Sequence, residues 1–249
     1  MADPLVILTV AATFLLAGAV KGVIGLGLPT VSLALMTVLL DLPSAMALLL
    51  VPSFVTNLWQ ASAGGHGIMI ARRIWPFLAM ATVTVWLGAT ALTRVDLALL
   101  SALLGMLLVV YSAVSLAGIR LEISARQEVW AGPLAGTANG ILTGMTGSFV
   151  VPGVLFLQAI GLPRDALVQA MGMLFTASTL ALAAALKGNG LLTGELGMLS
   201  AIALLPALAG MVVGQQVRRR LPEPAFRRVF FIALLLLGGY IIAGALGGQ

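Results

Sequence analysis

The stretch Gly18-Ala-Val-Lys-Gly-Val-Ile-Gly-Leu-Gly-Leu-Pro29 decides how this chain folds, because a related stretch occurs a second time. The second copy reads Gly136-Thr-Ala-Asn-Gly-Ile-Leu-Thr-Gly-Met-Thr-Gly-Ser-Phe-Val-Val-Pro152. Each copy places glycines and a proline, which weaken helices, inside an otherwise apolar run. In lipid, such breaks persist only where neighbouring protein or a water-filled cavity satisfies the freed backbone groups. We interpret both copies as broken membrane helices that line a binding site.

The two copies align residue by residue. Lys21 pairs with Asn139, and the other pairs are Gly18 with Gly136, Gly22 with Gly140, Gly25 with Gly144, Gly27 with Gly147 and Pro29 with Pro152. The similarity continues downstream, where Leu42-Pro-Ser-Ala45 resembles Leu162-Pro-Arg-Asp-Ala166 and Gly65-His-Gly67 resembles Gly188-Asn-Gly190. Proline is favoured in the first turn of a helix, so both proline turns are predicted to open helices. The chain is therefore predicted to be a tandem duplication.

The composition indicates a membrane protein. Of 249 residues, 61% are hydrophobic and only 8% are charged, against roughly 25% charged residues in an ordinary soluble domain. Apolar runs of about 20 residues, the length that crosses the ~30 Å hydrocarbon core, recur from end to end. We expect an all-α polytopic protein of the cell inner membrane.

Breaks in the apolar runs divide the chain into two repeats of about five helical pieces each. Residues 1–118 form the first repeat, 119–130 an interfacial amphipathic linker and 131–249 the second repeat. The predicted pieces are 5–20, 23–40, 44–63, 75–93 and 97–117 in the first repeat, and 131–147, 149–160, 165–186, 196–216 and 226–246 in the second.

Charge placement predicts that the repeats have inverted topologies. The arginine-rich loop at 217–228 should be cytoplasmic, whereas its counterpart at 94–96 carries little charge. The loop at 64–74 contains two arginines, whereas its counterpart at 187–195 has one lysine and one glutamate. This reversal is typical of inverted repeats in transporters. The opening hairpin of each repeat, spanning or re-entrant, then returns to its starting side, and both chain termini are external.

Backbone donors form the centre of the predicted site. A helix that begins inside the membrane offers unpaired N–H groups and the positive end of its dipole, which favour anions. We expect the pieces after the two glycine motifs to direct such donors into a shared cavity. Glycine lets a ligand approach the backbone without a Cβ in the way, and the glycines assigned to the site are Gly25, Gly27, Gly144 and Gly147. The alternative is that small residues only let helices pack closely.

Polar side chains complete this predicted substrate-binding site. Hydroxyl donors to an oxyanion are expected from Thr30, Thr143, Thr146 and Ser148. Lys21 would either attract the anion or extend its charged end to the membrane interface. Asn139 is polar at the matching position, and Asn57 is the amide best placed to join the site. Intramembrane amides more often bond across helices, which is the role expected for Gln60 and Gln169.

Residues for other chemistries are scarce. The sequence contains no cysteine and a single histidine, so a two-histidine zinc motif is excluded. The aspartates lie at the ends of apolar runs, and the glycine motif lacks the lysine and hydroxyl of a phosphate-binding loop. We therefore predict no catalytic or metal-binding residues and no cofactor, and we do not expect an enzyme. The alternative to a transporter is a membrane scaffold or assembly factor that transports nothing.

The duplicated motif resembles the TauE/SafE family of sulfite exporters and organosulfonate permeases. The likeness rests on Gly18 to Pro29 with Asp41-Leu-Pro43, on Gly136 to Pro152 with Gly161-Leu-Pro163, and on their spacing across nearly the whole chain. Both copies depart from the usual glycine triplet, with Gly25-Leu-Gly-Leu28 and Thr146-Gly-Ser-Phe149.

The resemblance implies secondary transport of a small anion by alternating access, with sulfite or an organosulfonate as the favoured substrate. The expected partners are that anion, the lipid bilayer, a coupling proton or cation and a second copy of the chain in a homodimer. The net charge of +5 is assigned to topology signals at the ends of apolar runs, and no nucleic acid is expected to bind.

Overall fold

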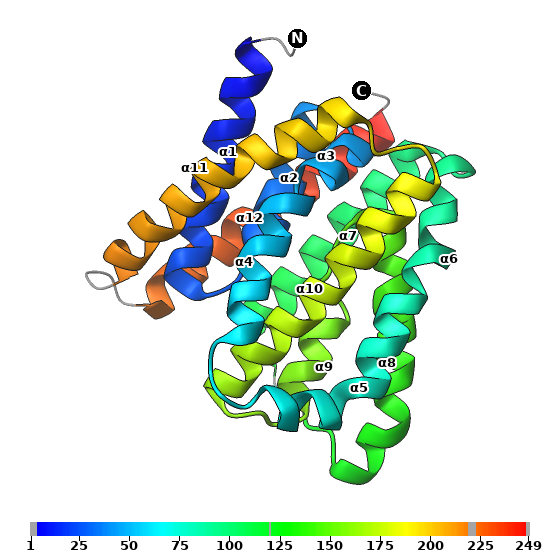
Figure 1. Ribbon diagram of the computed structural model, residues 1–249, viewed down its shortest axis with the longest axis vertical. Coiled ribbons are helices and arrows are strands. Elements are labelled where there is room, and N and C mark those ends of the chain that lie inside the picture. The colour runs from blue at the N-terminus through cyan, green and yellow to red at the C-terminus, as the bar shows by residue number, and fades with distance from the viewer. Residues whose placement is uncertain (1–3, 120, 219–222, 248–249) are drawn as a thin grey trace. The chain divides into compact units, whose positions relative to one another are not determined.

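The computed structural model describes residues 4–119, 121–218 and 223–247, and in these segments the regular structure is helical, with no strand (Figure 1). One short 3₁₀ helix, η1, spans Thr90–Thr93. The α-helices are α1 (Pro4–Ile24), α2 (Leu28–Leu39), α3 (Leu42–Leu48), α4 (Leu50–Ser62), α5 (Gly67–Val83), α6 (Val85–Ala89), α7 (Leu97–Ala117), α8 (Ala125–Thr146), α9 (Gly153–Ala159), α10 (Arg164–Gly188), α11 (Gly194–Arg218) and α12 (Glu223–Gly247).

Many of these helices can cross a bilayer. Among the described residues, 6 helices are long and apolar enough, and α3 with α4 supplies a further span bent by 45°. The predicted all-helical, multi-pass architecture is therefore confirmed. The predicted 97–117 coincides with α7, whereas residues 125–130 of the predicted linker form the first turns of α8.

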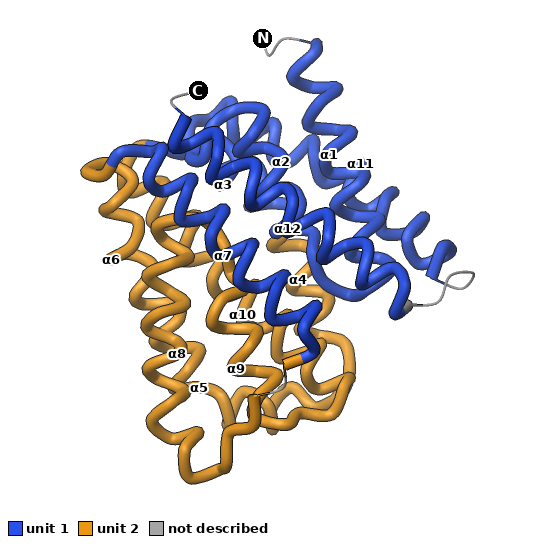
Figure 2. Tube along the Cα trace, turned by 180° about the vertical axis from the view of Figure 1, so that it is seen from behind, with its two compact units in different colours: residues 1–52, 96–118, 191–249 blue, residues 53–95, 119–190 orange. Residues whose placement is uncertain are grey.

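The chain divides into two compact units, each built from both halves of the sequence (Figure 2). Unit 1 comprises residues 1–52, 96–118 and 191–249, and unit 2 comprises residues 53–95 and 119–190. Unit 1 thus combines the first hairpin with α7, α11 and α12, and unit 2 combines α5 and α6 with α8, α9 and α10. The two halves of the duplication are interleaved, and α4 passes from one unit into the other.

Within unit 1, glycines allow α1 and α11 to pack backbone against backbone. A Cβ at Gly18 would collide with the carbonyl oxygen of Ala207, and a Cβ at Gly22 with that of Met211. A glycine of α11 likewise faces α1, since Gly214 lies against the backbone of Ala19. The contacts advance along both helices together, so the helices run parallel. These glycines explain why α1 continues to Ile24 instead of breaking near residue 20.

Unit 2 repeats this packing between α8 and the α5–α6 pair. A Cβ at Gly140 would press on the carbonyl oxygen of Ala81, and a Cβ at Gly144 would collide with that of Val85. In the opposite direction, Gly88 faces the backbone of Ile141, as Gly214 faces Ala19 in unit 1. The same interhelical contact is therefore formed once in each unit.

Packing corrects the register of the repeat by one helical turn. The equivalent of Gly18 is Gly140, four residues later than the predicted Gly136. The helix breaks agree with this register, since α1 ends two residues after Gly22 and α8 ends two residues after Gly144. Gly25 then corresponds to Gly147, and Lys21 corresponds to Thr143, not to Asn139.

A proline divides the predicted piece 44–63 into α3 and α4. Pro52 has no N–H to donate to the carbonyl oxygen of Leu48, one turn earlier. The Ser200 hydroxyl from α11 donates to this oxygen at 2.8 Å and accepts a bond from the Val51 N–H at 3.0 Å. A side chain from the other half of the sequence thus satisfies the backbone at the bend.

Candidate functional site

The first helix break lies between α1 and α2. Two glycines with positive φ, Gly25 at 79° and Gly27 at 109°, reverse the chain after Ile24. Gly27 is the N-cap of α2 and is followed by Pro29 in the first turn, where a proline needs no N–H partner. A Cβ at Gly27 would lie 3.5 Å from the Phe230 ring, so the break packs against α12 within unit 1.

The side chains predicted at this break are buried. Lys21 lies in the last turn of α1 and is 4% exposed, so in this structure it does not extend to the surface as the alternative role required. Thr30 lies in the first turn of α2 and is equally buried. Lys21, Gly25, Gly27 and Thr30 are therefore neighbours along one helix–turn–helix segment of unit 1.

The second break, between α8 and α9, is longer and contains more polar groups. Helix α8 ends at Thr146, Gly147 has a positive φ of 74°, and α9 begins only at Gly153. The residues from Gly147 to Val151 are all buried. A buried, non-helical segment of this length exposes backbone groups that must find other partners.

Local side chains satisfy part of this backbone. The Thr143 hydroxyl donates to the Ser148 carbonyl oxygen at 2.9 Å. The Ser148 N–H donates to the Thr146 hydroxyl at 3.2 Å, and that hydroxyl donates to Leu142 O in its own helix at 2.7 Å. Oδ1 of Asn139 accepts a bond from the first N–H of α9, that of Gly153, at 2.9 Å. Four of the predicted site residues therefore meet at this break.

Other donors at the second break stay without a protein partner. Within the part of the chain that the structure describes, no acceptor is bonded to the amide N–H groups of Phe149, Val150 and Val151. In the same described segments, Nδ2 of the fully buried Asn139 has no partner, and the Ser148 hydroxyl forms no hydrogen bond. Unpaired buried donors are costly, so this segment is suited to an occupant that accepts hydrogen bonds.

The predicted glycines separate into two groups. Gly25, Gly27 and Gly147 have positive φ and shape the breaks. Gly144 instead lies inside α8 against Val85, so its close contact is with a helix. The alternative to a binding role, in which a small residue lets two helices pack closely, accounts for Gly144.

Side-chain amides form hydrogen bonds between α4 and α10 in both directions. Nε2 of Gln60 donates to the Val168 carbonyl oxygen, and Nε2 of Gln169 donates to that of Ala61, each at 2.8 Å. The side-chain oxygen of Gln169 is also used, since its Oε1 accepts a hydrogen bond from the His66 N–H at 3.2 Å. The predicted bonding of Gln60 and Gln169 across helices is confirmed. Asn57, on the same helix as Gln60, is fully buried in unit 2.

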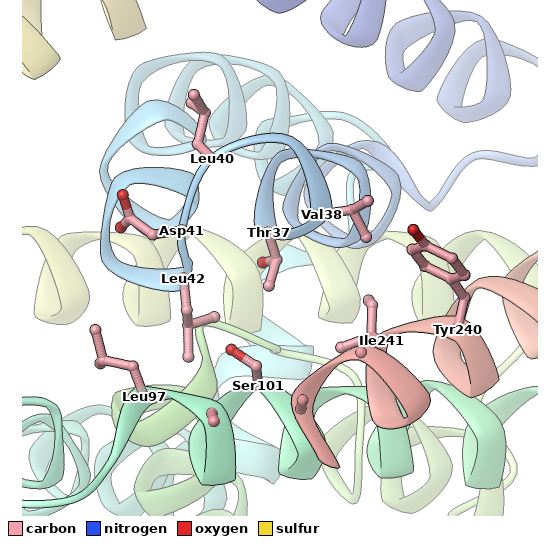
Figure 3. Close-up of a pocket in the computed structure, with 12 residues that line it drawn as sticks. Thr37, Val38, Leu40, Asp41, Leu42, Leu97, Ser101, Tyr240 and Ile241 are labelled. Atoms are coloured by element: carbon pink, nitrogen blue, oxygen red, sulfur yellow. The ribbon is translucent and has the colours of Figure 1, made fainter. Parts of the chain in front are cut away.

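Unit 1 also contains a cavity of about 360 Å³ where α2 ends and α7 begins (Figure 3). The side chains of Thr37 and Ser101 face each other across it, with Asp41 at its edge. Asp41 caps α3 by accepting from the Ser44 N–H, and Asp96 caps α7 by accepting from the Ala98 N–H, each at 2.8 Å. Carboxylates already occupy both helix N-termini, so this cavity is poorly suited to an anion.

Taken together, the helices define a multi-pass membrane protein with a duplicated helix–break–helix element. The family model described as sulfite exporter TauE/SafE matches residues 10–241. The chain therefore belongs to the TauE/SafE family, a family of membrane transporters for sulfite and organosulfonates. No curated protein and no solved structure was found to match the chain.

Proposed function

We propose that this protein is a secondary transporter of a small anion, with sulfite or an organosulfonate as the favoured substrate. The anion binds at the two helix breaks, and alternating access moves it across the bilayer. The observation that carries the proposal is the buried segment Gly147–Val151, in which consecutive amide N–H groups have no protein partner in the described structure.

The chemistry of the breaks favours an anion over a cation. From Gly136 to Gly161 the sequence contains no charged residue, and from Pro4 to Leu40 its only charge is Lys21. Amide and hydroxyl donors without nearby carboxylates stabilise negative charge, as at other backbone anion sites. The oxygen atoms of sulfite or a sulfonate can accept several such bonds together, and bonds to a charged acceptor are the stronger kind.

Alternating access is the mechanism expected for transporters built from inverted repeats, in which one bundle of helices moves against another around the substrate. Each unit contains one of the two breaks. A coupling proton or cation and a homodimer remain part of the proposal. A scaffold or assembly factor, the alternative function, predicts no substrate movement.

Flux measurements in proteoliposomes test the proposal. Purified protein is reconstituted, and uptake of sulfite, methanesulfonate and sulfate is compared with that of protein-free vesicles. We expect flux of sulfite or the sulfonate that saturates with concentration. Absence of flux for all three anions, in vesicles whose protein is folded and oriented, would reject transport and favour the scaffold.

Ser148→Ala tests the site directly. The Ser148 hydroxyl forms no hydrogen bond within the described residues, so its removal should leave the fold unchanged. A hydrogen bond to a charged group contributes about 1.5–3 kcal/mol, so we expect anion uptake at subsaturating concentration to fall by roughly tenfold or more. Ser62→Ala is the matched control, because the Ser62 hydroxyl is exposed and bonds only within its own helix. Equal uptake by both variants would remove Ser148 from the site.

A further inference from the structure

An apolar groove lies on unit 1 between α1, α2 and α12. Its volume is about 270 Å³. Its floor is formed by the buried residues Val20, Val31, Phe230 and Leu234, and its rim includes the exposed residues Leu16, Val229 and Ala233. A cleft with this lining offers an occupant no hydrogen bond, so the occupant must be apolar along its length.

The length and position of the groove match one leaflet of a bilayer. Its lining along α12 extends from Phe226 to Leu237, twelve residues that rise by ~17 Å at 1.5 Å per residue. This distance is about half of the ~30 Å hydrocarbon core. The groove starts in the first turn of the span Pro224–Gly247. It therefore covers the depth that a lipid acyl chain occupies in one leaflet.

The end of the groove nearest the start of α12 is basic. Arg227 and Arg228 follow Phe226 directly, and both are exposed. Arg227 lies over the Phe231 ring at 5.9 Å, and that ring packs on Phe230 in the groove floor at 5.0 Å. Among the side chains that the structure describes, neither arginine forms a salt bridge with an acidic one. The 360 Å³ cavity near the other end of α12 has an acidic group at its edge instead, the carboxylate of Asp41.

We propose that this groove binds an anionic phospholipid, with an acyl chain along α12 and the phosphate near Arg227. The apolar floor selects a hydrocarbon chain, and the basic end selects negative charge at the membrane surface. A lipid held here packs against α2 immediately after the first helix break. The site is independent of the proposed substrate, because it requires only the groove and the arginines.

Tryptophan quenching can test this site because the residues that line the groove include none of the four tryptophans of the chain, at positions 59, 75, 86 and 130. Val229→Trp places a reporter on the exposed rim, and Leu236→Trp is the control, since Leu236 is exposed on α12 but does not line the groove. Each variant is reconstituted in phosphatidylcholine vesicles with increasing brominated phosphatidylglycerol or brominated phosphatidylcholine. Fluorescence of the unsubstituted protein in the same vesicles is subtracted.

We expect the Val229→Trp reporter to be half-quenched at a mole fraction of brominated phosphatidylglycerol roughly fivefold lower than that of brominated phosphatidylcholine. This ratio corresponds to ~1 kcal/mol for one arginine near the surface. The Leu236→Trp control should be quenched equally by the two lipids. Arg227→Gln should abolish the difference at position 229.

A second pair of variants tests the groove itself. Ala233→Phe fills the groove and should remove preferential quenching at position 229, whereas Ala243→Phe adds the same bulk to an exposed position outside it. Equal quenching by the two lipids in the Val229→Trp protein would overturn the proposal.

Discussion

At the scale of single residues, glycine has two different uses in this chain. Gly18, Gly22, Gly140 and Gly144 lie inside helices whose partners leave no space for a Cβ. Gly25, Gly27 and Gly147 lie between helices, and each has a positive φ. Glycine adopts this conformation more readily than other residues. Close packing and helix interruption therefore depend on different members of each motif.

Two alanine substitutions in α11 should separate a packing glycine from an unconstrained one. A Cβ at Gly210 would collide with the Leu15 carbonyl oxygen, whereas a Cβ at Gly197 meets no atom within 4 Å. We expect Gly210→Ala to destabilise the protein by about 1–3 kcal/mol through overpacking. Gly197→Ala should stabilise the helix by about 0.5–1 kcal/mol. Thermal unfolding in detergent measures both, and equal melting temperatures would contradict the packing role.

The sequence predicted that the duplicated glycines matter but could not tell which of them interrupt a helix. Gly18 and Gly22 were expected at a break because glycine weakens helices. The deciding contact is with α11, distant in sequence, which makes glycine favourable inside the helix. The polar cluster was predicted better, since Asn139, Thr143, Thr146 and Ser148 do meet. Their roles in substrate binding remain predictions.

At the scale of elements, Arg73 fastens the short helix α9 to its neighbours. Its guanidinium forms two-pronged hydrogen bonds with Glu128 in the first turns of α8 and donates to the Ile160 carbonyl oxygen at 2.9 Å. The adjacent Ala159 carbonyl oxygen accepts a bond from the Ile123 N–H, also at 2.9 Å. The end of α9 is thus tied to both α5 and the chain before α8.

Removing this attachment should loosen α9. Arg73→Gln breaks the ion pair and weakens the bond to Ile160, so we expect faster amide hydrogen exchange in residues 153–161. Arg72→Gln is the control, because Arg72 is also exposed and forms no salt bridge in the described structure. Exchange measured by mass spectrometry should increase only for the Arg73 variant. Unchanged exchange in both variants would show that α9 is held by its apolar contacts alone.

Element boundaries were predictable where one apolar run forms one helix. The run 97–117 coincides with α7 because Asp96 caps its start and Gly118, with a φ of 65°, ends it. The predicted 149–160 shortens to α9, since the buried segment before it is non-helical and its backbone bonds with side chains. The bend at Pro52 depends on Ser200, a contact between the two halves that local sequence does not specify.

At the scale of the whole molecule, the duplication and the compact units divide the chain differently. Each unit joins an opening hairpin from one half to helices from the other half. The inverted orientation of the repeats, predicted from arginine placement, concerns the sides of the membrane on which matching loops lie. Those sides can be measured, because the chain has no cysteine of its own.

Single cysteines in two matching loops should react from opposite sides of the membrane. His66→Cys and Asn189→Cys occupy the centres of the related loops Gly65-His-Gly67 and Gly188-Asn-Gly190. We expect a membrane-impermeant maleimide to label the Asn189 variant in intact cells and the His66 variant only after permeabilisation, because arginine-rich loops stay in the cytoplasm. Labelling of both variants from one side would contradict inverted repeats.

The interleaving of the two halves also sets the order in which the bundles are completed during synthesis. Unit 2 ends at residue 190, so all of its helices leave the ribosome before α11 and α12 are made. Helix α1 is synthesised first, yet the helix that fits against Gly18 and Gly22 comes nearly last. The opening hairpin is therefore synthesised long before its partner α11. Unit 1 can be completed only after unit 2, although it contains the first helix of the chain.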